Sequence, residues 1–321
     1  MGYKWQRGRK VKMSDIDVRD AFFDKVYALA QKDRNLLFLT DDMGAYSLDA
    51  FKKNLPDQFI NVGVAEQNMI SVAAGLALSG KKVFVYGIAP FITMRCYEQI
   101  KVDLCCMNLP VTVVSVGAGH TYGSDGPTHH ATHDIAIMRA LPEITILNPS
   151  DAVTTAAFAE MSYKSSGPCY VRIERGRLPQ IYNEPDNDFS EGLKCLKSGS
   201  DLTIIATGEM VHQAFKVVKR LAEHSVDAGV IDFYRIKPVN ENLLLNFLEQ
   251  SKKIVTIEEN SIIGGIGTIV SEILSDNNKP FPLKRLAVND YHCYKYGDRE
   301  WLNALSGLDE DSIVKSILDW I

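Results

Sequence analysis

The stretch NVGVAEQNMISVAAGLALSGKKVFVYGI, residues 61–88, contains the pattern that decides the fold. A helical segment rich in small residues, ISVAAGLALSG, leads into VFVYGI (83–88), a short apolar run of the kind that forms buried strands. Small residues let the helix pack closely against its neighbours. A helix followed directly by a strand that is apolar on both faces is typical of a parallel sheet built from βαβ units.

The same alternation continues on both sides of this stretch. Further apolar runs, each followed by a helical pattern or a polar loop, are LLFLT (36–40), VTVVSV (111–116), ITIL (144–147) and CYVRI (169–173). After a polar, proline-bearing segment at 178–192 the alternation starts again. We therefore predict an α/β fold of two domains with mainly parallel sheets flanked by helices: 14–180, a linker at 181–192, and 193–321.

Composition agrees with a two-domain globular protein. The chain has 321 residues, of which 46% are hydrophobic and 23% charged, with a formal net charge of -5. This charge gives no basic surface for nucleic acid, and no apolar run approaches the roughly 20 residues of a membrane helix. The six cysteines form no CxxC pair, which favours free thiols in a reducing compartment and a cytoplasmic location.

Two segments place single residues where α/β proteins hold ligands. Glu66, in NVGVAEQNM (61–69), lies at a passage from strand to helix, where a carboxylate among apolar groups can share a proton with a ring nitrogen. Phe91, in APFITMRCYEQIKVDL (89–104), follows a strand at its carboxyl end. On these residues alone, an acid at a helix N-terminus and a core aromatic are the simpler interpretations.

The segment GAGHTYGSDGPTHHATHD (117–134) is long, glycine-rich and dense in imidazole. It holds four of the seven histidines, namely His120, His129, His130 and His133. Histidine serves as acid, base or hydrogen-bond donor near neutral pH. A zinc site is the competing interpretation, because His129 and His133 would lie one helical turn apart, but no HExxH glutamate or cysteine set accompanies them. We favour a catalytic loop and predict no metal ligand in this chain.

The last candidate segment is VRIERGR (171–177), which is rich in arginine. Arg172, Arg175 and Arg177 suit the binding of a phosphate or carboxylate, and equally well suit ordinary ion pairs.

Taken together, these segments resemble the transketolase family in its split form, where the two halves are separate chains. The residues that carry the resemblance are GVAEQNM, RCYEQIKVDL, YGSDGPTHH with its DGPTH core, PSDAV, VRIERGR, and TIEEN with GGIG. The order of GVAEQNM and DGPTH, about 60 residues apart, is specific, and the likeness begins near residue 14 and covers almost all of the chain. It implies the pyrimidine-binding and C-terminal domains of a thiamine diphosphate enzyme.

For the cofactor, the resemblance implies three residues. Glu66 would contact N1′ of the aminopyrimidine and favour the imino tautomer, whose nitrogen deprotonates C2. Phe91 would belong to the aromatic pocket around that ring. Asp42, in TDDMG, is similar to a family aspartate near the thiazolium.

For the substrate, the resemblance implies a set of polar side chains. His129 would stabilise charge on substrate oxygens and relay a proton, Asp125 would hydrogen-bond a donor hydroxyl, and Arg175 would contact an anionic group. The family commonly has a phosphate-contacting histidine where Gly117 stands, whereas His120 follows three positions later and is expected to contact the substrate. A modified or unphosphorylated ketose, or another carbonyl compound, is therefore the expected donor.

The sequence lacks one family element, a GDG segment followed by an asparagine. The family uses that segment to bind magnesium and diphosphate. We therefore expect Mg²⁺ and the diphosphate to be held by a partner, an N-terminal-half transketolase-like subunit, in an α2β2 heterotetramer that transfers a two-carbon ketol or acyl unit from a small carbonyl donor to an acceptor.

Two other functions are compatible with the same fold. One is the β subunit of a 2-oxoacid dehydrogenase, against which DGPTH argues. The other is a non-catalytic interaction or regulatory subunit, against which the presence of Glu66, Asp125 and His129 argues.

Overall fold

The computed structural model describes residues 3–6, 9–183 and 188–321, and its chain forms two compact units. The first unit comprises Met1–Ala118 and Met138–Asp188, and the second comprises Gly119–Ile137 and Phe189–Ile321. The histidine-rich segment thus belongs with the C-terminal residues and not with the strands that precede it in the sequence.

The first unit contains a parallel sheet with the strand order β7-β8-β6-β5-β3-β4. The strands are β3 (Leu36–Thr40), β4 (Phe59–Asn61), β5 (Lys82–Ile88), β6 (Val111–Val116), β7 (Thr145–Leu147) and β8 (Cys169–Ile173). Each apolar run that predicted a strand here forms one. Because helices cover both faces, the central strands β3, β6 and β8 are buried along their whole length.

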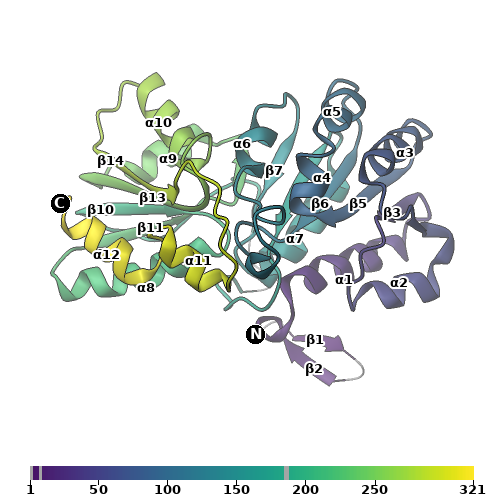
Figure 1. The fold of residues 1–321 in the computed structure, drawn as a ribbon, viewed down its shortest axis with the longest axis horizontal. Coiled ribbons are helices and arrows are strands. Elements are labelled where there is room, and N and C mark those ends of the chain that lie inside the picture. The colour runs from purple at the N-terminus through teal and green to yellow at the C-terminus, as the bar shows by residue number, and fades with distance from the viewer. Residues whose placement is uncertain (1–2, 7–8, 184–187) are drawn as a thin grey trace. The chain divides into compact units, whose positions relative to one another are not determined.

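Helices lie on both sides of this sheet, with α1, α2 and α7 on one face and α3, α4 and α5 on the other (Figure 1). Their bounds are α1 (Val18–Ala30), α2 (Leu48–Asn54), α3 (Glu66–Leu78), α4 (Ala89–Thr93), α5 (Tyr97–Gln99), the π-helix η3 (Ile100–Cys105) and α7 (Ala152–Lys164). The helix N-termini of α1 and α7 are capped by Asp17 and Asp151.

The region after β5 differs from the single helix that its sequence pattern predicts. The chain forms α4, turns at residues 94–96, and continues through α5 into the π-helix. At the turn the backbone N–H groups of Met94 and Arg95 both donate to the carbonyl oxygen of Pro90, at 3.1 and 3.4 Å. This interruption places Arg95 at the bend between two short helices.

The second unit contains a sheet with the strand order β14-β13-β10-β11-β9, parallel except for β9 at its edge. Its strands are β9 (Lys194–Lys197), β10 (Leu202–Ala206), β11 (Ala228–Asp232), β13 (Lys253–Ser261) and β14 (Leu283–Val288), and β12 (Arg235–Lys237) follows β11. The predicted fold of mainly parallel sheets flanked by helices is confirmed for both units.

Five helices surround this second sheet. They are α8 (Met210–Glu223), α9 (Glu241–Leu248), α10 (Ile266–Asp276), α11 (Arg299–Leu305) and α12 (Glu310–Leu318), and α6 (Asp134–Arg139) lies where the chain passes from one unit to the other. The GGIG segment begins α10: the Glu258 carboxylate accepts hydrogen bonds from the backbone N–H groups of Ile266 and Gly267, both at 2.8 Å. A Cβ on Gly265 would lie 2.5 Å from Cδ of Glu258, so this buried cap requires glycine there.

Near the N-terminus, β1 (Tyr3–Gln6) and β2 (Arg9–Lys12) pair in antiparallel orientation. Part of the expected linker, residues 184–187, lies outside the described residues. Just before it, the Asp151 carboxylate accepts hydrogen bonds from the backbone of Ile181 and Tyr182, each at 2.9 Å. Among the described residues no helix has both the length and the apolar composition needed to cross a membrane.

Candidate active site

The first unit has its polar loops at the topological switch point of its sheet. Strand β5 lies beside β3, and the connection leaving β3 toward β4 runs in the opposite direction to the connection leaving β5 toward β6, which is the arrangement that opens a crevice at the carboxyl ends of strands in α/β sheets. The segments that follow β3, β4 and β5 carry Asp41, Glu66 and Phe91. Residues from three separate segments are therefore brought to the edge of the sheet where α/β proteins bind ligands.

Glu66 is the first residue of α3 and is 3% exposed. The chain turns into the helix at Gly63, whose positive φ of 73° is a conformation that favours glycine. The helix N-terminus stabilises negative charge on the carboxylate. Oε1 of Glu66 accepts a hydrogen bond from Nη1 of Arg95 at 2.7 Å, which gives the buried carboxylate an ionic partner.

Arg95 connects the carboxylate to an aromatic ring. Its guanidinium lies over the ring of Phe91, 4.5 Å from the ring centroid. Glu66, Arg95 and Phe91 therefore form one continuous group, in which a planar cation occupies the space next to a buried carboxylate. A flat, nitrogen-rich heterocycle can likewise stack on an aromatic ring and hydrogen-bond to a carboxyl group.

Asp41, directly after β3, is a second buried carboxyl group in this crevice, and the sequence pattern did not single it out. Burial is the main cause that raises the pKa of Asp41 from 3.8 to about 7, and the Glu66 charge adds to this rise. A Cβ on Gly87 would lie 2.6 Å from Oδ2 of Asp41, so the glycine makes room for this carboxyl group. Oδ1 of Asp41 is buried and has no hydrogen-bond partner among the described residues.

The predicted cofactor residue Asp42 is the exposed neighbour of Asp41. It has a positive φ of 70°, which aspartate tolerates better than most residues. Its backbone N–H donates to Oδ1 of Asn61 at 3.1 Å, and Nδ2 of Asn61 donates to its carboxylate at 2.9 Å. These two hydrogen bonds connect the end of β3 to the end of β4, just before the turn that leads to Glu66.

Two other predicted positions lie at the ends of β6 and β8. Arg175 follows β8 and is exposed, whereas Arg172, within the strand, is buried. Gly117 follows β6 with a φ of 91°, and its N–H donates to the carbonyl oxygen of Ile173 at 3.0 Å. A histidine at this position would have a strained backbone, so the main-chain conformation favours glycine over the histidine of the family pattern.

In the second unit, the histidine-rich loop is closed at its base by an antiparallel bridge between Gly119 and Ala131. Asp125 is exposed in a 3-10 turn, Gly123–Asp125, near the tip of the loop. His129 is half-buried, and its Nδ1 lies 3.1 Å from Oγ1 of Thr128. The loop thus presents a carboxylate and an imidazole four residues apart.

Side chains from the end of the sequence pack directly beneath this loop. A Cβ on Gly126, whose φ is 81°, would collide with the Tyr296 ring, and a Cβ on Gly123 would lie 2.6 Å from the carbonyl oxygen of Gly297. The glycines of YGSDG therefore allow the loop to approach the segment before α11. His120, the residue after the bridge at the base of the loop, is 1% exposed.

His133 and His129 do not share a helical turn, because α6 begins only at Asp134. His133 instead lies beside His292, with ring centroids 5.8 Å apart, and burial and the neighbouring His292 lower the pKa of His133. The spacing that suggested zinc does not produce the expected geometry.

Comparison with known proteins identifies the relatives of this chain. Residues 14–180 match the transketolase pyrimidine-binding domain and residues 192–313 match the transketolase C-terminal domain. The chain is 39% identical to one of the subunits of the apulose-4-phosphate transketolase of Phocaeicola vulgatus, over 95% of this chain and 98% of that protein. It is 34% identical to the 6-deoxy-6-sulfo-D-fructose transketolase subunit SqwH of a Clostridium species, over 96% of this chain and 95% of that protein.

A solved structure shows the same architecture. A split gene transketolase, described as an inactive β4 tetramer, superposes with a TM-score of 0.84 at 33% identity, and the match covers 95% of this chain and 97% of that one. The motifs, the fold and these relatives agree, and the chain belongs to the transketolase family, matching its split-gene subunits along nearly their whole length.

Proposed function

We propose that this chain is the pyrimidine-activating subunit of a two-chain, thiamine diphosphate-dependent transketolase that moves a two-carbon ketol unit between small carbonyl compounds. The observation that carries the proposal is the buried Glu66 at the start of α3, in the switch-point crevice of a transketolase pyrimidine-binding domain. The proposed domains are 14–180 and 193–321, joined by a linker at 181–192.

The residues of the crevice fit the aminopyrimidine of the cofactor. Arg95 engages only Oε1 of Glu66, which leaves Oε2 for N1′ of the ring. Phe91 supplies an aromatic ring, on which Arg95 stacks, and Oδ1 of Asp41, which has no hydrogen-bond partner among the described residues, supplies a hydrogen-bonding position. Asp42 stays a predicted contact from the same turn. When bound, thiamine diphosphate supplies the carbon nucleophile and the electron sink for carbon–carbon cleavage.

The chain's own residues hold and move protons. Glu66 keeps a proton shared at N1′, a role for which a buried carboxylic acid is suited. With its pKa raised to about 7, Asp41 exchanges a proton near neutral pH and, in its protonated form, adds no second negative charge beside Glu66. His129 and Asp125 are proposed to hydrogen-bond substrate oxygens, with His129 as the proton relay, while His120 and Arg175 contact the substrate.

The substrate class follows from the loop chemistry and the relatives. Arg175 suits an anionic group, and Gly117 removes a histidine that the family commonly places against phosphate. The relatives from Phocaeicola vulgatus and Clostridium act, by their names, on a ketose phosphate and on a sulfonated deoxy ketose. We propose that the donor here is an anionic ketose derivative.

The diphosphate and Mg²⁺ are proposed to be bound by a partner chain that carries a GDG segment and a downstream asparagine, in an α2β2 assembly. Exposed apolar side chains on or next to α3, α4 and η3 support a protein partner for the first unit. They are Val64, Leu78, Met94, Val102 and Met107. We propose an enzyme of carbohydrate metabolism in the cytoplasm, and the six free cysteines support a reducing compartment.

The test is reconstitution with the partner. The chain is co-expressed with a GDG-bearing partner, and thiamine diphosphate binding is measured by calorimetry with and without Mg²⁺. The pair is then assayed for glycolaldehyde transfer from anionic ketoses and for pyruvate decarboxylation. We expect cofactor binding by the pair and ketol transfer. No cofactor binding would indicate a non-catalytic subunit, and decarboxylation without ketol transfer would indicate a 2-oxoacid dehydrogenase-type subunit.

A further inference from the structure

His120 is held by residues of the C-terminal part of the chain. Its Nδ1 lies 2.9 Å from Oδ1 of Asn303, which is 7% exposed on α11, and 3.7 Å from Oε1 of Glu259 on β13. Because an amide oxygen and a carboxylate both accept hydrogen bonds, they favour a proton on Nδ1. Nε2 is then the ring nitrogen with an acceptor lone pair.

Glu259 is fixed in turn by Arg299. Nε of Arg299 donates to both carboxylate oxygens, at 2.9 and 3.0 Å, and its Nη2 makes a further short contact with Oε2. Nη1 of the same guanidinium pairs with Glu209. This bidentate pairing sets the orientation of the carboxylate next to Gly119, where even a Cβ would collide with it. The base of the histidine loop is thus fitted against a rigid ion-pair network.

The charged and titratable groups around His120 are Glu259, Arg299 and His130. The His130 ring is edge-on to the His120 ring, with centroids 5.1 Å apart. Burial, and then the neighbouring His120, lower the pKa of His130, so His130 adds no positive charge near neutral pH. Asn303 is the neutral acceptor at Nδ1, so it favours one tautomer without altering the charge balance.

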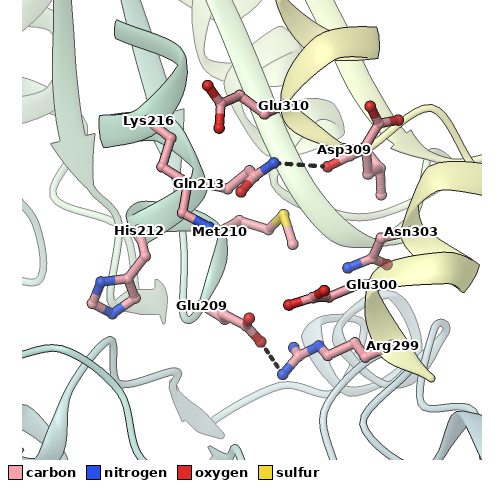
Figure 2. Close-up of a pocket in the computed structure, with 11 residues that line it drawn as sticks. Glu209, Met210, His212, Gln213, Lys216, Arg299, Glu300, Asn303, Asp309 and Glu310 are labelled. Atoms are coloured by element: carbon pink, nitrogen blue, oxygen red, sulfur yellow. Dashed lines mark hydrogen bonds and ion pairs between the residues drawn. The ribbon is translucent and has the colours of Figure 1, made fainter. Parts of the chain in front are cut away.

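Asn303 also lines a pocket of about 260 Å³ in the second unit. Figure 2 shows Arg299, Glu300 and Asn303 of α11 along one wall, opposite Glu209, Met210 and Gln213. Glu300 is exposed and lies in the same pocket, and so provides a matched control for changes at Asn303.

We propose that Asn303 is a positioning residue of the C-terminal domain that fixes His120 with its proton on Nδ1, so that Nε2 accepts a hydrogen bond from a hydroxyl group of the ketose. This inference rests on the proposed function only for the identity of the group that meets Nε2. The C-terminal domain then has a defined part in the site, because its Asn303 determines which ring nitrogen of His120 donates a hydrogen bond and which accepts one.

The experiment compares Asn303→Leu, Asn303→Asp and the control Glu300→Gln in the chain reconstituted with its partner. The His120 tautomer is read from the ¹⁵N chemical shifts of its ring nitrogens, and kcat/KM is measured across pH. Circular dichroism and calorimetric cofactor affinity report on the fold and on the Glu66 crevice.

For Asn303→Leu we expect loss of the Nδ1–H preference and a fall in kcat/KM of roughly 10–100-fold, with unchanged cofactor affinity. Asn303→Asp keeps an acceptor but adds charge that stabilises the protonated ring, so the acidic limb of the pH profile should move to higher pH. Glu300→Gln should behave as the wild type.

An Asn303→Leu protein that keeps the wild-type tautomer, or a kcat/KM within twofold of the control, would overturn the proposal. Should the reconstituted wild type transfer no ketol unit at all, the proposed function fails, while the ¹⁵N measurement still decides whether Asn303 sets the tautomer. Should Asn303→Leu disturb the fold, Asn303→Asp decides the question through the direction of its pH shift.

Discussion

The Glu66 crevice and the histidine loop are built in different ways. In the crevice, Glu66 and Arg95 are 29 residues apart, and each lies at or just after a strand-to-helix passage of one parallel sheet. Under the loop, His120 and Asn303 are 183 residues apart, and the contact depends on the C-terminal domain folding against the loop. The first arrangement follows from the regular βα repeat, whereas the second requires long-range packing.

This difference has a consequence for substitution. A crevice that consists of successive strand ends is positioned by the backbone, so single changes there should alter chemistry or protonation rather than geometry. A loop that is held by side chains from a distant segment should respond to changes at residues that touch no substrate.

The largest effect is expected for Glu66→Gln, which keeps the shape of the side chain but removes its ability to exchange a proton. The reconstituted enzyme should lose several powers of ten in turnover, because protonation at N1′ depends on this carboxyl group. Glu249→Gln, at an exposed position of the second unit, makes the same chemical change and should be close to wild type. Near-normal turnover of Glu66→Gln would remove the crevice from the mechanism.

The next largest effect is expected for His129→Ala. Loss of a general acid or base should lower kcat roughly 10²–10⁴-fold while cofactor affinity, measured by calorimetry, stays unchanged. His224→Ala serves as control, since His224 is exposed at the end of α8. If His129→Ala also lost cofactor affinity, the loop and the crevice would be coupled, which would contradict the view that they are built independently.

Asp41→Asn tests protonation in the crevice through stability. The folded pKa of about 7 lies above the ordinary value of 3.8, so between these values the folded state holds a proton that the unfolded state has released. In the wild type, the contribution of Asp41 to the free energy of unfolding is therefore fully present at low pH and is lost as pH rises through 7.

Asparagine cannot ionise, so the Asp41→Asn protein should gain stability relative to the wild type as pH rises from 5 to 8. The gain should be roughly 3 kcal/mol or less at pH 8. Denaturant unfolding of the chain at several pH values measures it. A pH-independent difference between the two proteins would show that Asp41 titrates normally.

The smallest effect is expected for the exposed apolar side chains on or next to α3, α4 and η3 of the first unit. Leu78 is 62% exposed at the end of α3, and Leu78→Lys should weaken association with the partner roughly tenfold or less, since most interface positions contribute little individually. Leu305→Lys makes the same change at an exposed position of α11. Equal effects of both changes on partner affinity would argue against a specific α3 interface.

The sequence predicted the strands of the first unit well because each is a continuous apolar run bounded by polar turns, as in VTVVSV and CYVRI. It predicted Glu66 and the DGPTH loop because these are compact motifs. It did not single out Asp41, since TDDMG offers two adjacent acids and only burial distinguishes them. It also did not indicate the break at residues 94–96, where an even helical pattern hides the turn that carries Arg95.

The sequence by itself determined the alternation of strands and helices and the family, and it supplied the candidate site residues, because periodicity and short motifs are local properties of the chain. Only the tertiary structure decided which acid is buried, which cation reaches Glu66, and that Asn303 and Glu259 lie against His120. These facts depend on burial and on contacts across as many as 183 residues, and no local pattern encodes which distant side chain fills the space beside a given atom.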